Sequence, residues 1–237
     1  IRVIMITGDH EITARAIAKD IGLTGKTITG EKLDEINNLD SLVEDISIFA
    51  RVNPEHKIKI VDALKKKGHI VAMTGDGIND APALKKADIG IAMGITGTDV
   101  SKEASAMILT DDNFASIVNA VEEGRGIYDN IKKYFAFLIS GNIGEVLIIF
   151  ISIIMGIPLP LTVTQILLIN LAMDGPPAIS LSAESFEPDV MSRKPRSQKE
   201  PIYLGIRNYI FLFPAVMVVV VLLVFIYFYR ADGLVKA

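Results

Sequence analysis

The sequence predicts an α/β domain with a doubly wound parallel sheet, followed by an α-helical transmembrane region. Two observations predict this order. Short runs of β-branched and apolar residues alternate with helical patterns through the first 126 residues, which is typical of a parallel sheet covered by helices. The remaining residues contain long stretches with almost no charged side chains, and the mean hydropathy of +0.41 is high for a soluble protein. We therefore divide the chain into a domain, 1–126, and a membrane region, 127–237.

The charge distribution supports this division and excludes one class of function. Residues 1–126 hold 15 Lys and Arg against 20 Asp and Glu, whereas residues 127–237 hold 9 against 8. Such an acidic domain lacks the basic stripe that neutralises phosphates in nucleic-acid-binding proteins, so we expect no nucleic-acid partner. The chain has no cysteine, which excludes disulfides, thiolate metal sites and thiol catalysis.

Predicted strands and helices alternate along the first domain. The strands are expected at 3–6, 46–50, 69–73, 89–93 and 107–109, and the helices at 12–21, 54–67, 79–86 and from 114 onward. Ligands of doubly wound sheets bind at the carboxyl ends of the strands. The polar loops Thr7-Gly8-Asp9 and Thr74 to Asp80 follow two of these strands, so we expect the functional site there.

The loop from Thr74 to Asp80 has the composition of a site for a phosphoryl group and a metal. Its glycines let the backbone approach a phosphate, and Asp76 offers a hard oxygen to Mg²⁺. Asn79 and Asp80 can hold the geometry of the loop. For Asp76, an ordinary turn aspartate is the alternative interpretation.

The other candidate residues lie on separate segments. Thr7, Gly8 and Asp9 offer a hydroxyl and backbone amides, and Lys57 can neutralise a transferring phosphoryl group from the start of a predicted helix. For Lys57, a solvated helix face shared with neighbouring lysines is the alternative. These loops contain no nucleophile paired with a base and no Walker loop.

Three transmembrane helices are predicted after residue 127. Residues 134–183 contain two carboxylates and no Lys or Arg, and this stretch is too long for one span because about 20 helical residues cross a bilayer core. A turn with Gly156, Pro158 and Pro160 divides the stretch in two. The predicted spans are 134–155, 161–183 and 208–229.

Basic residues beside the spans predict their orientation. Lys132 and Lys133 precede the first span, and several Lys and Arg residues lie between the second and the third. Positive charge marks the cytoplasmic side of a membrane protein. We therefore expect residues 1–126 in the cytosol and the protein in the cell membrane.

Two carboxylates lie deep in the predicted spans. Glu145 has Asn142 three residues before it, and Asp174 has Asn170 four residues before it, so each pair shares a helix face. An ionisable group at this depth is costly and indicates a functional site. The prolines after Gly175 predict that the helix unwinds near Asp174 and exposes backbone carbonyls. This set of oxygen ligands suits a hard cation; the alternative is that the amides only join helices.

Several of these segments resemble one protein family. Residues 73–90 (MTGDGINDAPALKKADIG) resemble the hinge signature of P-type ATPases, in their haloacid-dehalogenase-like (HAD-like), Rossmann-like phosphorylation domain. Residues 5–9 are similar to the second phosphate loop of that family, and residues 50–57 to its lysine segment. Residues 142–146 and 170–175 resemble the fifth and sixth helices of the type II, calcium-transporting subgroup. The resemblance covers essentially the whole chain, as the C-terminal part of the phosphorylation domain plus transmembrane helices five to seven.

The resemblance implies a role for each candidate residue. Contacts to an aspartyl phosphate would come from the two loops and the lysine segment, namely from Thr7, Gly8, Lys57 and Asn79, with Asp9 in the same catalytic loop. Asp76 would bind Mg²⁺ and Asp80 would brace the site. The transported cation would be bound by Asn142, Glu145, Asn170 and Asp174. The helix from Phe114 to Ile157 would form stalk and fifth span in one piece.

The function implied is ATP-driven transport of a cation, Ca²⁺ first, through an aspartyl-phosphate intermediate with Mg²⁺ and ATP as cofactors. The chain contains no Asp-Lys-Thr-Gly segment, so we expect a partial pump, inactive alone, whose partners are the lipid bilayer and the missing N-terminal portion of the pump. One alternative is a Na⁺/K⁺-type pump, although Asn170 stands where those pumps usually carry an acid. Another is a non-catalytic Mg²⁺-binding membrane partner that regulates an intact pump.

Overall fold

The computed structural model describes residues 1–36, 38–197 and 199–232. The chain divides into two compact units, Ile1–Val118 and Asn119–Ala237. The boundary between them falls inside one long helix, α6 (Phe114–Met155), which confirms the uninterrupted helix predicted from residue 114.

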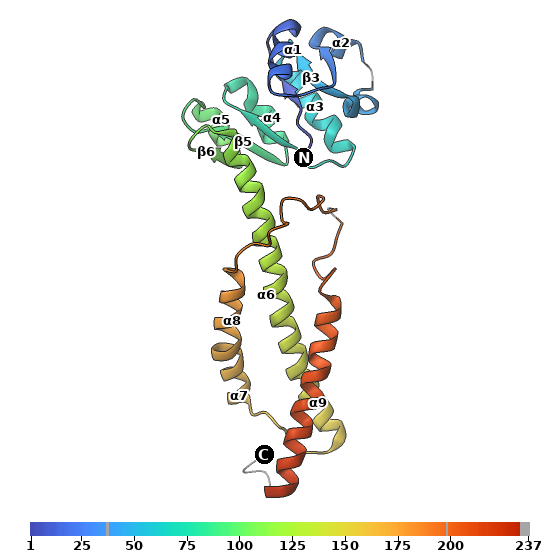
Figure 1. Cartoon of the computed structure of the whole chain (residues 1–237), viewed down its shortest axis with the longest axis vertical. Helices are drawn as coiled ribbons and strands as arrows, with labels where there is room; N and C mark the ends of the chain where they lie inside the picture. Colours follow the sequence, from blue (N-terminus) through green and yellow to red (C-terminus); the bar gives the residue numbers. More distant parts are fainter. Residues whose placement is uncertain (37, 198, 233–237) are drawn as a thin grey trace. The chain divides into compact units, whose positions relative to one another are not determined.

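The first unit alternates strands and helices, which confirms the predicted α/β class (Figure 1). Its strands are β1 (Met5–Ile6), β2 (Lys26–Thr29), β3 (Ile46–Ala50), β4 (Ala72–Gly75), β5 (Ile89–Met93) and β6 (Met107–Leu109). Its helices before α6 are α1 (Glu11–Asp20), α2 (Gly30–Glu35), α3 (Pro54–Lys66), α4 (Ala81–Lys86) and α5 (Asp99–Ala104), with 3₁₀ turns at Leu39–Ser41, Val43–Asp45 and Ile78–Asp80. Strand β2 and helices α2 and α5 were not predicted, because each is short and carries little periodicity.

The strands form two three-stranded parallel sheets, in the orders β1-β3-β2 and β4-β5-β6. The predicted parallel direction of the strands is confirmed. Within the described residues no hydrogen-bonded ladder joins β1 to β4, so the prediction of one continuous sheet is corrected to two sheets. Both sheets contribute to one hydrophobic core, which contains Phe49 of β3, Met73 of β4 and Ile60 of α3. The two sheets are therefore packed together while β1 and β4 each remain an edge strand.

The strand β4 begins three residues later than predicted because the residues that follow Lys66 form the C-cap of α3. Gly68 has φ of 85°, and the amide of His69 donates to the carbonyl of Leu64, which is the hydrogen-bond pattern of a glycine C-cap. The amide of Val71 then donates to the Asp88 carboxylate at 2.9 Å. These residues are occupied by cap and loop hydrogen bonds, and the ladder starts at Ala72.

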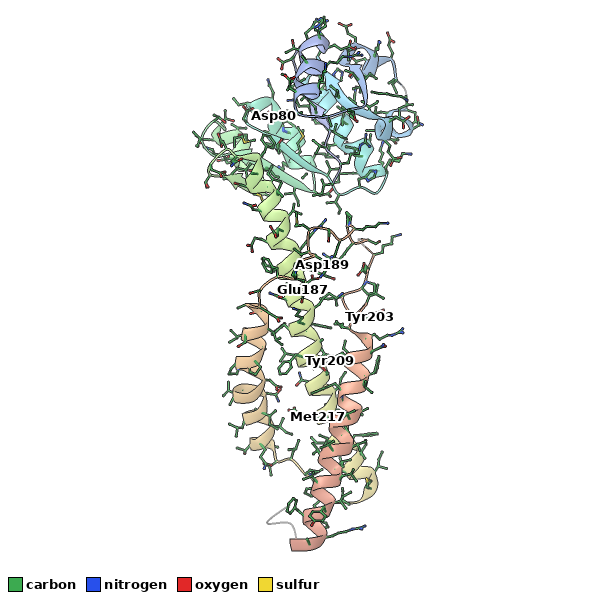
Figure 2. The ribbon with its side chains drawn as sticks, in the orientation of Figure 1. Asp80, Glu187, Asp189, Tyr203, Tyr209 and Met217 are labelled. Carbon is green, nitrogen blue, oxygen red and sulfur yellow. The ribbon has the colours of Figure 1, made fainter. Side chains whose placement is uncertain are left out.

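The second unit contains most of α6, then α7 (Val163–Leu168), a π-helix (Ile169–Asp174), α8 (Gly175–Ser182) and α9 (Arg207–Asp232). Figure 1 shows α7 and α8 along one side of α6 and α9 along another. Ile148 of α6 packs with Val218 and Leu222 of α9. A Cβ added at Gly144 would lie 2.7 Å from the sulfur of Met217 (Figure 2), so glycine allows the close approach of these helices.

Two helices among the described residues, α6 and α9, are long and apolar enough to cross a membrane, by length and composition alone. The stretch of the second predicted span is also helical, but it is divided among α7, the π-helix and α8. The predicted unwinding near Asp174 is corrected: the chain widens into a π-helix instead. Pro176 and Pro177 lie in the first turn of α8, where a missing amide breaks no intrahelical hydrogen bond.

The segment between α8 and α9 is fastened to α6 by polar contacts. Arg125 donates to the carbonyl oxygens of Val190 at 3.0 Å and of Arg193 at 3.1 Å. The guanidinium of Arg193 pairs with Asp129 on α6 and with Asp189 in its own segment, and this hydrogen bond lowers the pKa of Asp189. Figure 2 shows Asp189 and Glu187 beside α6.

Candidate functional site

The Thr7 loop begins where β1 ends, as predicted. The Thr7 hydroxyl donates to the Asp9 carboxylate at 2.8 Å and accepts from the Asp9 amide at 3.1 Å. The amide of Arg51 donates to the carbonyl of Asp9 at 2.9 Å, and that of Val52 to the carbonyl of Thr7 at 3.2 Å. The loop after β1 is therefore held against the segment that leads from β3 into α3, and Gly8 is exposed between its two fixed neighbours.

The start of α3 is fixed by a reciprocal cap. Asn53 Oδ1 accepts from the amide of His56 at 2.9 Å, and His56 Nδ1 accepts from the amide of Asn53 at 3.2 Å. His56 is buried, and its Nε2 lies 2.8 Å from Asp34 Oδ1. Since Nδ1 is an acceptor, Nε2 carries the proton and donates to Asp34, which lowers the pKa of that carboxyl. This cap fixes the first turn of the helix that carries Lys57.

Lys57 and Asp80 form an ion pair in the interior of the site. Their side chains are 17% and 9% exposed, so the alternative of a solvated face for Lys57 does not fit. Asp80 Oδ2 also accepts from the amide of Gly77 at 3.2 Å. A Cβ at Gly75 would lie 2.5 Å from the Cβ of Asp80, so only glycine leaves room for the carboxylate that Figure 2 labels.

Asp76 and Asn79 are exposed on the same loop. The backbone carbonyl of Asp76 accepts from the amide of Thr98 at 2.9 Å and from the hydroxyl of Ser101 at 3.1 Å. Sequence reasoning missed Thr98 and Ser101. The available signal was a threonine at a helix N-cap with a serine three residues later, and in the structure the Ser101 amide donates to the Thr98 hydroxyl. The loop is thus anchored through its backbone while its carboxylate faces solvent.

The residues of this loop can supply one ligand to Mg²⁺ but not a complete coordination shell. Among the described side chains, no group of three His, Asp or Glu residues is arranged to hold a metal, so this site offers one carboxylate, that of Asp76. Mg²⁺ keeps several waters and commonly takes one or two carboxylates together with phosphate oxygens. Asp76 therefore fits as one ligand among several.

Asp112 is a second residue that sequence reasoning missed. Its carboxylate accepts from the amides of Gly94, Ile95 and Thr96 and from the Thr96 hydroxyl, at 2.6 to 3.0 Å. These donors lower the pKa of Asp112 to about 2. The carboxylate thereby fixes the loop that leads to Thr98. A carboxylate directly after a short strand was the available signal.

The predicted residues of the first unit form two clusters. Lys57, Asp80 and the Asp76 loop are connected, and the Thr7 loop is connected to Val52. In the part of the chain that the structure describes, no hydrogen bond or ion pair links the Thr7 loop to Asp76 or Asn79. The two clusters stand at the ends of β1 and β4, which are each an edge strand of their sheet.

The second unit brings three of its four predicted site residues together. Glu145 is 5% exposed, and its Oε2 accepts from Asn170 Nδ2 at 3.2 Å. Asp174 Oδ2 is buried and has no hydrogen-bond partner among the described residues. It faces α6 at Gly141, one turn before Glu145, where an added Cβ would lie 3.7 Å away.

Asn142 is the fourth predicted residue, and its side chain is exposed. No hydrogen bond joins it to Glu145, Asn170 or Asp174 in the described ranges. The buried serines of α6 do not contribute either, because Ser152 donates to Ile148 of its own helix at 2.7 Å. The site therefore consists of two carboxylates and one amide.

Comparison with protein families gives two matches. Residues 1–88 match the model of haloacid dehalogenase-like hydrolases, and residues 158–236 match the model described as cation transporting ATPase, C-terminus. The first match contains Thr7, Lys57 and Asp76, and the second contains Asn170 and Asp174. Glu145 lies between the two matched ranges and is covered by neither.

Individual relatives are similar over most of the chain. A calcium-transporting ATPase of Bacillus subtilis is 54% identical over 208 residues, which are 86% of this chain and 23% of the relative. One of Listeria monocytogenes is 55% identical over 86% of this chain and 24% of the relative. A P-type sodium-transporting ATPase of Toxoplasma gondii is 51% identical over 85% and 16%. The chain spans about a quarter of the length of the first of these curated relatives.

A solved structure shares the fold. The crystal structure of a zinc-transporting PIB-type ATPase in the E2.Pi state matches with a TM-score of 0.52 and 28% identity, over 76% of this chain and 24% of that one. The match extends well beyond the length of either unit alone.

Proposed function

Since this chain belongs to the P-type cation-transporting ATPases, we propose that it forms part of a pump that moves Ca²⁺ across the cell membrane at the expense of ATP. The chain would supply the C-terminal part of the phosphorylation domain and three of the membrane helices. The observation that carries the proposal is the pair of carboxylates, Glu145 and Asp174, in apolar helices, with one buried oxygen of Asp174 lacking a partner among the described residues.

The cation site follows from the donors. Glu145, Asp174 and the amide oxygen of Asn170 are hard ligands, and Ca²⁺ takes six to eight such oxygens. The π-helix contains both Asn170 and Asp174. Its i→i+5 pattern allows both side chains to lie on the helix face that is turned toward Glu145. Remaining ligands would come from Asn142 after a side-chain change, from water and from other helices of the pump.

The phosphoryl site follows from the first unit. Mg²⁺, when bound, would neutralise charge on the phosphoryl oxygens and so reduce their repulsion of the group that attacks phosphorus. Asp76 would hold the ion, Lys57 would present its ammonium group to the phosphate, and Asp80 would keep Lys57 in position before phosphate arrives. Thr7 and Gly8 would supply a hydroxyl and an amide, Asp9 would orient Thr7, and Asn79 would contact the phosphate by its side-chain amide.

The phosphorylated aspartate would come from the missing N-terminal portion. Its place is suggested by the edge strands β1 and β4, whose ends carry the Thr7 loop and the Asp76 loop. A parallel strand paired with both edges would end between the two loops. Phosphoryl contacts from both clusters would then converge on one residue.

The test is acid-stable phosphoenzyme formation in native membranes. Labelled ATP is added with Ca²⁺, with Na⁺ or with chelator, and the products are separated on an acid gel and probed with an antibody to the 183–207 segment. Label that depends on Ca²⁺, in a band several times heavier than 25.8 kDa, supports the proposal. An antibody signal at 25.8 kDa without label under any ion contradicts it and favours a non-catalytic regulator.

A Na⁺-transporting pump is the second candidate, favoured by the 51% identity to the sodium-transporting ATPase of Toxoplasma gondii. The same assay separates the two, because label that requires Na⁺ and is indifferent to Ca²⁺ would select the sodium pump. The donor set favours Ca²⁺, since two carboxylates supply the charge that a divalent ion requires.

A further inference from the structure

Ser101 has no place among the residues that contact phosphate or cation, yet it is completely buried. Its hydroxyl lies 3.1 Å from the backbone carbonyl oxygen of Asp76 and 2.8 Å from that of Thr98. The Thr98 hydroxyl in turn donates to Ser101 Oγ at 3.3 Å. Ser101 is thus the junction between the first turn of α5 and the Asp76 loop.

The Asp76 carbonyl accepts from the Thr98 amide at 2.9 Å and shares the single proton of the Ser101 hydroxyl with the Thr98 carbonyl. These contacts hold the peptide plane that follows Asp76, and a held backbone fixes the direction of the Cα–Cβ bond of this residue. The carboxylate is exposed, and among the described residues it makes no hydrogen bond or ion pair. The backbone anchor therefore fixes where the Asp76 side chain starts, and rotation about its side-chain bonds then brings the carboxylate to a metal ion.

We infer that Ser101 is a positioning residue for the metal-binding carboxylate of Asp76, acting through the Asp76 carbonyl. The inference rests on the proposed function, in which Asp76 holds Mg²⁺. Groups that orient a metal ligand without touching the metal typically contribute 10- to 100-fold to metal affinity. Because Ser101 acts through the backbone and Thr98 remains as a second donor, we expect the low end, about tenfold.

The experiment measures metal binding on the complete 237-residue chain in detergent. Mn²⁺ replaces Mg²⁺ as the probe, and its paramagnetic broadening of the amide signals of residues 75–79 is followed by NMR. Ser101→Ala is expected to need about tenfold more Mn²⁺ for the same broadening, and Ser101→Thr, which keeps the hydroxyl, to restore part of the loss. Ser105→Ala is the matched control, because that hydroxyl donates only to Lys102 of its own helix at 2.9 Å.

Equal Mn²⁺ dependence in Ser101→Ala and the wild type would overturn the inference. So would an equal loss in Ser105→Ala, because a general loosening of α5 would then explain the effect. Ser101→Cys, which nearly preserves the volume with a weak donor, replaces Ser101→Ala if the alanine variant does not fold. Site-specific broadening in the wild type without any phosphoenzyme in membranes would remove the pump proposal and leave this inference standing.

Discussion

The two oxygen-rich sites differ in how their charges are satisfied. In the first unit Lys57 neutralises Asp80, and the carbonyl of Asp76 has two donors. In the second unit Glu145 has one amide donor, and Asp174 keeps a buried oxygen without a described partner. Burying an unpaired carboxylate is costly. The first site is therefore built before its ligand arrives, whereas the second needs a cation or a proton to complete it.

The largest effect is expected at the first site. Asp76→Asn removes the one carboxylate offered to Mg²⁺, and we expect at least about a hundredfold less phosphoenzyme when the variant is made in the complete pump, in line with the loss of other electrostatic groups in catalysis. Binding of Ca²⁺, measured with radioactive calcium on washed membranes, is expected to remain. Asp20→Asn, on the exposed end of α1, is the control. Loss of Ca²⁺ binding in Asp76→Asn would contradict the separation of the two sites.

The next largest effect is expected from substitutions of the two buried carboxylates of the second unit. Glu145→Gln and Asp174→Asn each remove one charge from the cation site, and we expect Ca²⁺ affinity to fall by about a hundredfold, because Ca²⁺ affinity depends strongly on the number of charged ligands. The measurement is the Ca²⁺ dependence of phosphoenzyme formation by the complete pump that carries each variant. Glu123→Gln, exposed earlier on α6, should behave as the wild type. Wild-type Ca²⁺ dependence in either site variant would refute the cation-site assignment.

Breaking the charge pair tests the claim that the first site is built in advance. Asp80→Ala leaves Lys57 partly buried without its partner, and we expect the free energy of unfolding of the first unit to fall by about 3 kcal/mol. Urea unfolding of the complete chain, followed by hydrogen exchange of the β3 amides, measures it. The double variant Lys57→Met, Asp80→Leu should recover most of the loss, and failure to recover would show that Asp80 acts through other contacts.

A pH titration gives a smaller effect, confined to acid. The pKa of Asp112 is lowered to about 2 by backbone donors, below an unfolded value of about 3.9. Its contribution is therefore complete above about pH 4 and is lost as the pH falls through about 2. We expect the difference in Tm between the wild type and Asp112→Asn to shrink over this window. Asparagine tolerates the φ of 49° at this position, so backbone strain does not confound the comparison.

The smallest effect is expected at the exposed contacts of the second unit. Arg193→Ala removes the ion pairs with Asp129 and Asp189, and exposed pairs contribute little to stability because water and salt screen them. We expect proteolysis within 183–207 to accelerate a few-fold, with Ca²⁺ affinity unchanged. A change in Ca²⁺ affinity would show that the contact between this segment and α6 affects the cation site.

Much of the fold could be predicted because its signals are local. The α/β alternation, β3, β5 and β6, the start of α3 and the long helix α6 all follow from runs of apolar residues and capping residues. The division into two sheets could not be predicted, since strand pairing depends on contacts between distant segments. The π-helix was missed because the prolines after Gly175 indicate that a helix is perturbed but not which form it takes.

The candidate sites show the same limit. Thr7, Lys57, Asp76, Glu145 and Asp174 carry chemistry that is visible in a single residue and its neighbours. Ser101 and Asp112 act through backbone atoms of other segments; a local pattern marks each as a capping or turn residue but does not reveal which distant segment it holds. The separation of Asn142 from Glu145 was equally hidden, because an i, i+3 spacing places two residues near one face without fixing where their side chains end.

The edge strands β1 and β4 have a practical consequence. An unpaired edge presents a row of amides and carbonyls that will accept a strand from any chain. Each of the two described sheets has two edges, and β1 and β4 are among them, so that copies can add to one another without a closed end. Self-association that rises with concentration is therefore the expected behaviour of this polypeptide alone, and a peptide that pairs with both β1 and β4 should suppress it.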